Sequence, residues 1–199
     1  WARGESGYEW MQTHPALKAL DPMNLEPDLA RLVQSWVTPT EQFYVRSHGK
    51  TPKVDAAEYR LKITGLINGD VSYSLEELSR LFPQTSGMAT LQCAGNRRTE
   101  MSAIKKVGGV QWGPGAISNA NWSGVRLADV LRAAGVKDSA KHVEFIGRDS
   151  IDNKGQVAPF GGSIPIEKAL ASETLLAWGM NGEPLTPEHG APLRVVVPG

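Results

Sequence analysis

The stretch LQCAGNRRTE, residues 91–100, contains the only cysteine of the 199-residue chain. An unpaired cysteine most often packs in the interior as a small hydrophobic side chain. Here, however, Ala94-Gly95-Asn96-Arg97-Arg98 follows the cysteine, and this composition is typical of a turn rich in cations. Because nearby guanidinium groups favour a thiolate, we expect Cys93 to leave a strand and enter a loop that stabilises its charged form.

A thiolate of this kind serves as a nucleophile or as a metal ligand. A nucleophile needs a neighbouring base, usually histidine. His14, His48, His142 and His189 all lie far from Cys93 in sequence, which leaves that possibility open. A structural zinc site needs about four Cys or His ligands in paired spacing, and the sequence has no such pattern. A single protein thiolate suffices where a cofactor brings most of the ligands of its own metal. A pterin whose dithiolene sulfurs hold molybdenum is such a cofactor.

Composition excludes several other classes of protein. Hydrophobic residues make up 41% and charged residues 21% of the chain, as in ordinary globular proteins. Lys+Arg and Asp+Glu number 21 each, and this balance argues against nucleic acid as a partner. No apolar run approaches the roughly 18 residues of a membrane span. No G-x-G-x-x-G pattern opens a helix after a strand, so a dinucleotide-binding fold is not expected.

Periodicity predicts short strands and short helices in irregular order. Strands are expected near residues 59–65, 143–146 and 194–197, and helices over 28–36, 75–82 and 127–134, with a helical turn at 166–171. The helix after Ser74 has a Ser-Leu-Glu-Glu capping box. Because no regular βαβ alternation is visible, we expect an α+β fold with mixed sheets.

Residues 91–101 resemble the molybdenum-ligating loop of the sulfite oxidase family. Further segments are similar to the family's motifs in the same order: residues 43–49, 112–118, 122–125, 161–165, 180–185 and 189–199. The resemblance thus covers nearly the whole chain. It implies the sulfite-oxidase-type molybdopterin-binding fold, with an N-terminal arm over residues 1–40 packed on an oxidoreductase domain over residues 41–199.

The resemblance also implies a set of site residues. Cys93 would be the single protein ligand of molybdenum. The pterin cofactor would be held by Tyr44, Arg46, Ser47, His48, Cys93, Asp149, His189 and Arg194. A substrate-anion pocket would consist of Arg46, Arg98 and Trp112. Their chemistry agrees, since Arg and His form charge-assisted bonds with phosphate, Asp accepts from pterin N–H groups, and guanidinium and indole N–H groups hold the oxygens of a small anion.

Each of these residues also has an ordinary structural interpretation. His48 and His189 could be hydrogen-bonded loop histidines, and the arginines could pair with surface carboxylates. Asp149 follows Gly147-Arg148, where an Asx-type turn would explain it. A tryptophan such as Trp112 is more often part of a core. Because all of them fall at positions of the resembling motifs, we favour the functional interpretation for the set.

The activity implied by the resemblance is oxidation of sulfite to sulfate by oxygen-atom transfer at molybdenum. Electrons would pass to an external acceptor such as cytochrome c or oxygen. Nitrate reduction on the same fold is the rival activity, although residues 99–101 and 116–118 favour sulfite. A cofactor-binding module without turnover and a structural domain with a buried thiol are the remaining alternatives.

Two features depart from the family's pattern. Ser47 stands where asparagine is commoner, and either side chain can donate a hydrogen bond. The family also continues beyond Val195-Val196-Val197-Pro198-Gly199 with further pterin and substrate residues and an immunoglobulin-like dimerisation domain. We therefore expect these residues to be part of a longer polypeptide, homodimeric if that domain exists. Among compartments, we favour the periplasm of an exporting bacterium over a plant peroxisome.

Overall fold

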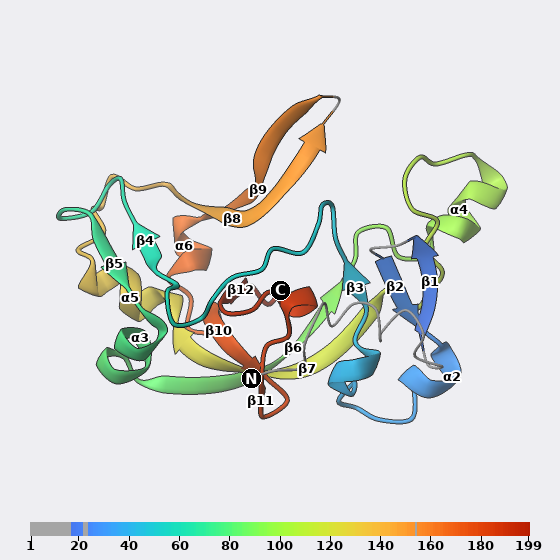
Figure 1. Cartoon of the computed structure of the whole chain (residues 1–199), viewed down its shortest axis with the longest axis horizontal. Coiled ribbons are helices and arrows are strands. Elements are labelled where there is room, and N and C mark those ends of the chain that lie inside the picture. The colour runs from blue at the N-terminus through green and yellow to red at the C-terminus, as the bar shows by residue number, and fades with distance from the viewer. Residues whose placement is uncertain (1–16, 22–23, 154) are drawn as a thin grey trace.

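The computed structural model describes residues 17–21, 24–153 and 155–199. Its centre is a five-stranded sheet, the curved base in Figure 1, ordered β11-β10-β7-β6 with β12 also paired to β10. These strands are β6 (Gln84–Gln92), β7 (Ile117–Arg126), β10 (Leu175–Met180), β11 (Glu183–Pro184) and β12 (Arg194–Val196). The β6–β7 pairing ends at Gln92↔Ile117. Cys93 therefore leaves the sheet directly after the last paired residue, as predicted.

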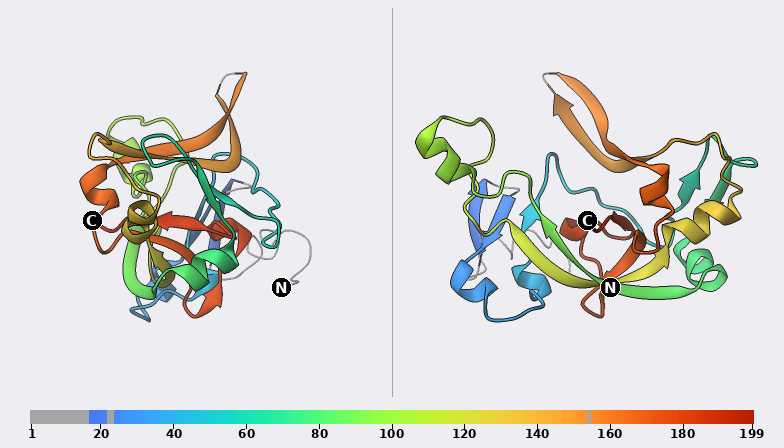
Figure 2. Two further views of the ribbon diagram at one scale, coloured as in Figure 1. Left: turned by 90° about the vertical axis from the view of Figure 1, so that its left-hand side faces the viewer. Right: turned by 180° about the vertical axis from the view of Figure 1, so that it is seen from behind.

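Three smaller sheets surround this centre. A three-stranded sheet contains β1 (Leu17–Asp21), β2 (Asn24–Pro27) and β3 (Val45–Arg46). Two hairpins consist of β4 (Leu61–Ile63) with β5 (Val71–Tyr73), and of β8 (His142–Asn153) with β9 (Gln156–Pro165). The β8–β9 hairpin projects away from the central sheet in every view of Figures 1 and 2.

The helices are short and lie around the sheets. They are α2 (Leu29–Leu32), α3 (Leu75–Leu81), α4 (Arg98–Ile104), α5 (Leu127–Ala133) and α6 (Ile166–Ala169), with 3-10 turns η1 (Thr40–Gln42) and η2 (Pro187–His189). The predicted capping box is present: the Ser74 hydroxyl accepts from the Glu77 N–H, and the Glu77 carboxylate accepts from the Ser74 N–H. This mixture confirms the α+β class.

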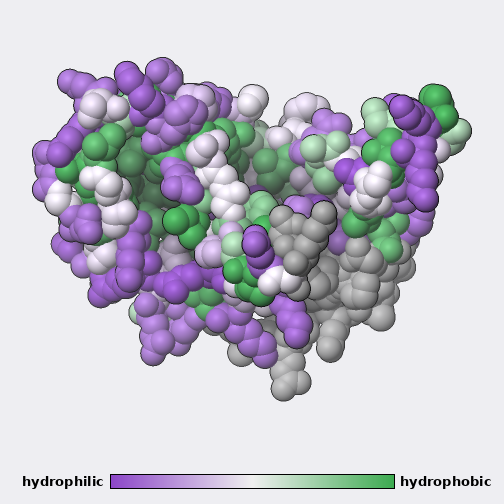
Figure 3. Space-filling view, turned by 90° about the horizontal axis from the view of Figure 1, so that it is seen from above, coloured by the Kyte–Doolittle hydropathy of each residue, from purple (hydrophilic) through white to green (hydrophobic). Residues whose placement is uncertain are grey.

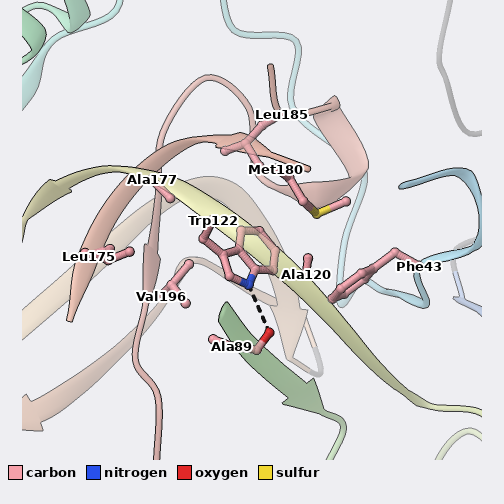
Figure 4. Close-up of a cluster of buried hydrophobic side chains, with 9 residues drawn as sticks. All are labelled: Phe43, Ala89, Ala120, Trp122, Leu175, Ala177, Met180, Leu185 and Val196. Atoms are coloured by element: carbon pink, nitrogen blue, oxygen red, sulfur yellow. Dashed lines mark hydrogen bonds between the residues drawn. The ribbon is translucent and has the colours of Figure 1, made fainter. Parts of the chain in front are cut away.

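The core lies against the central sheet. Figure 4 shows the cluster around Trp122 of β7, whose indole N–H donates to the Ala89 carbonyl at 3.1 Å. Phe43 packs edge-on against Trp122, with ring centroids 5.7 Å apart. This contact joins the segment leading into β3 to the sheet that carries Cys93. The segment before β3 and strand β7, which are distant in sequence, are therefore held together by core packing.

Hydrophobic surface appears in several places on the face shown in Figure 3, on its left-hand half as well as at its right-hand end. Among the exposed apolar side chains are two of α4, Met101 at 60% and Ile104 at 92% exposure. Within the described residues, no helix has the length and apolar character required to cross a membrane.

Candidate cofactor and anion site

Cys93 sits in the turn between β6 and α4. Its N–H donates to the Ala116 carbonyl, and its own carbonyl accepts from the Asn96 N–H, both at 2.9 Å. The Gly95 N–H lies 3.4 Å from the Cys93 sulfur. The thiol is therefore half-buried on a backbone fixed from both sides, with a main-chain donor directed at it.

The two arginines after the cysteine have different surroundings. Arg97 adopts a left-handed φ of 63° and pairs with the Glu100 carboxylate at 2.6 Å on the exposed surface. Arg98 is half-buried and donates from Nη1 to the Val110 carbonyl at 2.7 Å. In the described part of the chain the guanidinium groups thus engage Glu100 and Val110, and the donor at the sulfur is the Gly95 N–H.

A second loop, residues 112–116, docks on the cysteine turn. The Trp112 carbonyl accepts from the Thr99 N–H at 3.0 Å, and the Pro114 carbonyl accepts from the Asn96 amide at 3.0 Å. Trp112 is fully buried, and its ring lies edge-on to Tyr44 at 6.4 Å. Among the described residues, its indole N–H has no hydrogen-bond partner. Because an unpaired buried donor costs about 1–3 kcal/mol, this N–H marks a point where an acceptor on a ligand would fit.

Arg98 and Trp112 meet at Gly95. A methyl group added at Gly95 would lie 2.7 Å from Arg98 Nη2 and 2.8 Å from Trp112 Cδ1. The absence of a side chain at Gly95 therefore lets the guanidinium and the indole approach the cysteine turn together. Two of the predicted anion-pocket residues are thus neighbours.

Replacing Gly95 by alanine should disturb this junction. We expect the free energy of unfolding to fall by about 1–3 kcal/mol, because the new methyl group overpacks a closed site. Gly87→Ala is a matched control, since a methyl group there would meet nothing within 4 Å. Urea unfolding measures both variants. Equal stability of the two would contradict the close approach at Gly95.

His189 and Arg194 form a second buried cluster. His189 is 2% exposed, and its Nδ1 lies 2.8 Å from the Thr186 hydroxyl. Arg194 donates from Nη1 to the His189 carbonyl at 2.8 Å and stacks over Trp122 at 4.9 Å. Within the described chain, His189 Nε2 and Arg194 Nε are buried without partners. Both groups therefore have unused hydrogen-bonding capacity.

Tyr44 connects this cluster to the cysteine. Burial raises the pKa of Tyr44 to about 12, the charge of Cys93 adds to this increase, and Arg194 acts in the opposite direction. The phenol is therefore neutral near pH 7 and can donate its O–H. Its ring stacks on Phe43 at 5.5 Å and lies edge-on to Trp112 at 6.4 Å, so Tyr44 contacts both the core and the loop docked on the cysteine turn.

Burial also lowers the pKa of His189 to about 4; Arg194 acts in the same direction, and the nearby Phe43 backbone acts in the opposite direction. The folded state prefers the neutral imidazole. Its contribution to the free energy of unfolding is therefore fully present above about pH 6.5, the pKa of an unperturbed histidine. This contribution should be lost as the pH falls from 6.5 toward 4, by about 3 kcal/mol in total.

Urea unfolding of cofactor-free protein across this pH range tests the prediction, because no bound ligand then adds to stability. His189→Gln should show a flatter pH dependence than the unsubstituted chain. The matched variant His142→Gln, at an exposed histidine of β8, should keep the original dependence. Parallel curves for the unsubstituted chain and His189→Gln would contradict the neutral buried imidazole.

The remaining predicted residues lie where the end of β3 meets the β8–β9 hairpin. They are Arg46, Ser47 and His48 from the first segment, and Asp149 from β8 itself. Arg46 Nη2 is 3.2 Å from both ring nitrogens of exposed His48, and the His48 ring stacks on Phe160 of β9 at 5.3 Å. Asp149 lies in β8, at a register irregularity between Ile146 and Ser150. The pKa of His48 is lowered by partial desolvation and by Arg46, while Asp149 opposes the change. Gly49 packs closely on β8 beside Asp149, since a methyl group added at Gly49 would clash with the Ser150 carbonyl oxygen.

The ten predicted site residues fall into two groups in the structure. One contains Tyr44, Cys93, Arg98, Trp112, His189 and Arg194, and the other contains Arg46, Ser47, His48 and Asp149. Three residues that sequence reasoning overlooked also belong here: Asn24, Glu26 and Phe160. The polar-apolar-polar order of residues 24–26 was the available signal for the first two, whereas nothing in the sequence singled out Phe160.

The donor chemistry fits a large polar cofactor with a single protein thiolate ligand. Unpaired buried N–H or ring nitrogen atoms occur on Trp112, His189 and Arg194. In the described chain, no three His, Cys, Asp or Glu residues are grouped so as to hold a metal ion by themselves. A nearby open depression of about 290 Å³ lies on the outer side of the turn and is lined by Gln92, Asn96, Arg97, Glu100, Met101 and Ile104.

Comparisons with known proteins found similarity along nearly the whole chain. The model of the oxidoreductase molybdopterin binding domain matches residues 48–199. Mitochondrial sulfite oxidase of Mus musculus is 47% identical over 193 residues, covering 94% of this chain and 35% of that protein. Nitrate reductase [NAD(P)H] of Hordeum vulgare is 42% identical over 96% of this chain and 22% of its own length.

A solved structure is similar over nearly the whole chain. The sulfane dehydrogenase SoxCD of Paracoccus pantotrophus superimposes with a TM-score of 0.72 at 30% identity, covering 96% of this chain and 45% of that one. The chain spans about a third of the length of the mitochondrial sulfite oxidase it matches.

Proposed function

Because the chain belongs to the sulfite oxidase family of oxidoreductase molybdopterin binding domains, we propose that the protein oxidises sulfite to sulfate. In this reaction sulfite and water give sulfate, two protons and two electrons, and an external acceptor takes the electrons. When bound, molybdopterin supplies a molybdenum centre that transfers oxygen and accepts electrons in pairs. The chain supplies binding, orientation and charge.

The observation that carries the proposal is the set of unpaired buried polar atoms on Trp112, His189 and Arg194. Trp112 belongs to the segment 112–118, and His189 and Arg194 both belong to the segment 189–199. Each stands where the family motif places a cofactor or anion contact. We propose that Cys93 binds molybdenum and that the pterin is held by Tyr44, Arg46, Ser47, His48, Asp149, His189 and Arg194. Neutral Tyr44 and His189 would add hydrogen bonds without adding charge.

Anion binding is proposed for Arg46, Arg98 and Trp112. Two guanidinium groups attract and hold a doubly charged oxyanion, and the indole N–H of Trp112 offers one further donor. Because Trp112 is fully buried, it also keeps water away from one side of the pocket. These residues would hold the sulfite oxygens while its sulfur stays free to react.

Nitrate reduction is the second candidate, favoured by the 42% identity to the Hordeum vulgare enzyme. Molybdenum-loaded protein should reduce cytochrome c or ferricyanide when sulfite is added, and should leave reduced viologen unoxidised when nitrate is added. The reverse result would assign nitrate reduction. Inactivity in both assays would identify a cofactor-binding module.

A further inference from the structure

Strand β2 carries two buried polar side chains that no motif of the chain explains. Asn24 is 3% and Glu26 5% exposed. Since they are two residues apart on a strand, they point to the same face, and Leu25 between them points to the other face. Buried amides and carboxylates are costly unless they are hydrogen-bonded, so the partners of these two side chains indicate their role.

The partners of Asn24 belong to the anion pocket. The β2–β3 register places Asn24 opposite Arg46. The Asn24 amide oxygen accepts from Arg46 Nη1 at 3.1 Å and from the Ser47 N–H at 3.3 Å. One end of the Arg46 guanidinium is thereby held, which restricts where its remaining N–H groups can point.

The partner of Glu26 belongs to the loop that carries Trp112. Glu26 Oε2 accepts from the Gly113 N–H at 2.8 Å, and the Gly113 carbonyl accepts in turn from the Arg97 N–H at 2.9 Å. The only cation paired with Glu26 in the described chain is Lys18, at 4.0 Å and largely exposed. The carboxylate therefore fixes the peptide that follows Trp112 and, through it, the cysteine turn.

We propose that β2 sets the geometry of the anion pocket, with Asn24 and Glu26 as positioning residues for Arg46 and Trp112. This inference rests on the proposed sulfite chemistry. One strand reaches both sides of the pocket through adjacent same-face positions, so the distance between the Arg46 guanidinium and the Trp112 indole depends on it. Asn24 and Glu26 act through these residues and do not touch the substrate.

Paired variants of the molybdenum-loaded protein test the proposal. Asn24→Leu and Glu26→Met keep side-chain size and remove the acceptor, and each should raise the KM for sulfite about tenfold. The kcat should stay within about twofold, because the pocket is displaced while the reacting centre is retained. Glu26→Gln keeps an acceptor oxygen and should restore the original KM. Leu25→Val, on the opposite face, should lower stability and leave KM unchanged.

Hydrogen exchange gives a readout that does not depend on activity. In Glu26→Met the amide of Gly113 should exchange faster with solvent, and in Glu26→Gln it should exchange as in the unsubstituted chain. An unchanged KM in both acceptor-deleting variants, or an equal KM increase in Leu25→Val, overturns the positioning role. Loaded unsubstituted protein that does not oxidise sulfite refutes the proposed function instead, and the exchange experiment then still decides whether Glu26 holds the loop.

Discussion

Replacing Cys93 by serine should reduce sulfite oxidation by at least about 100-fold, since loss of even an outer-shell partner of a metal ligand costs about 10–100-fold. A hydroxyl is a much poorer ligand than a thiolate, and Cys93 is the one cysteine of the chain. Sulfite-dependent reduction of cytochrome c, normalised to molybdenum content, measures the effect. Normalisation separates a damaged centre from poor cofactor loading.

Ala94→Ser provides the matched control. It introduces the same hydroxyl one residue further along the same turn, at an exposed position, and should keep nearly full activity. Cys93→Ser protein that retains activity within about threefold of the unsubstituted chain would refute Cys93 as the ligand, because ligand loss is expected to cost far more.

Arg98→Met should lower kcat/KM for sulfite by about 100-fold, as expected for removal of one preorganised donor to an oxyanion. Methionine keeps much of the side-chain volume beside Gly95 and removes the charge. The neighbouring Arg97→Met variant loses only a solvent-screened ion pair with Glu100 on the surface and should change kcat/KM little.

Steady-state kinetics at several sulfite concentrations compare the two arginine variants. The assignment requires a large difference between them, because only Arg98 lies against Trp112 at Gly95. Equal losses of kcat/KM in both variants would mean that activity depends on the total positive charge of the turn, and not on a specific contact of Arg98 with the anion. A larger loss in Arg97→Met would exchange the two roles.

Local signals in the sequence predicted α3 and α5, whereas α4 was not predicted. The capping box at Ser74 and the glycine after Ala134 define α3 and α5 closely, because caps act through neighbouring backbone groups. The predicted helix over 28–36 is much shorter, spanning Leu29–Leu32. Asp28 caps it at the Ala30 N–H, but Val33 and Trp36 stay exposed, so no apolar face extends it.

The central strands were the least predictable part of the fold. β6 and β7 contain Gly, Ser, Asn and Gln, and their pairing is decided by contacts between distant segments. The same holds for β8, predicted over 143–146 and observed over His142–Asn153, because its second half is formed by pairing with the glycine-rich β9.

Sequence motifs indicated which residues to examine in the candidate site more directly than they indicated the strands of the fold. The positions of Cys93, Arg98 and Trp112 could be predicted from the cysteine turn and the loop that follows it. Asn24 and Glu26 could not, since neither carries a recognisable motif and their role depends on the β2–β3 register. Pairwise geometry, such as the meeting of Arg98 and Trp112 at Gly95, likewise requires the folded chain.

Molybdenum content per chain tests the central claim most directly. Protein purified from a host that makes molybdopterin should contain close to one molybdenum per chain by elemental analysis, roughly as expected for a cofactor bound through one thiolate and a dedicated set of pterin contacts. Less than about 0.1 molybdenum per chain from such a host would contradict the account, because a site built for this cofactor should fill when the cofactor is supplied.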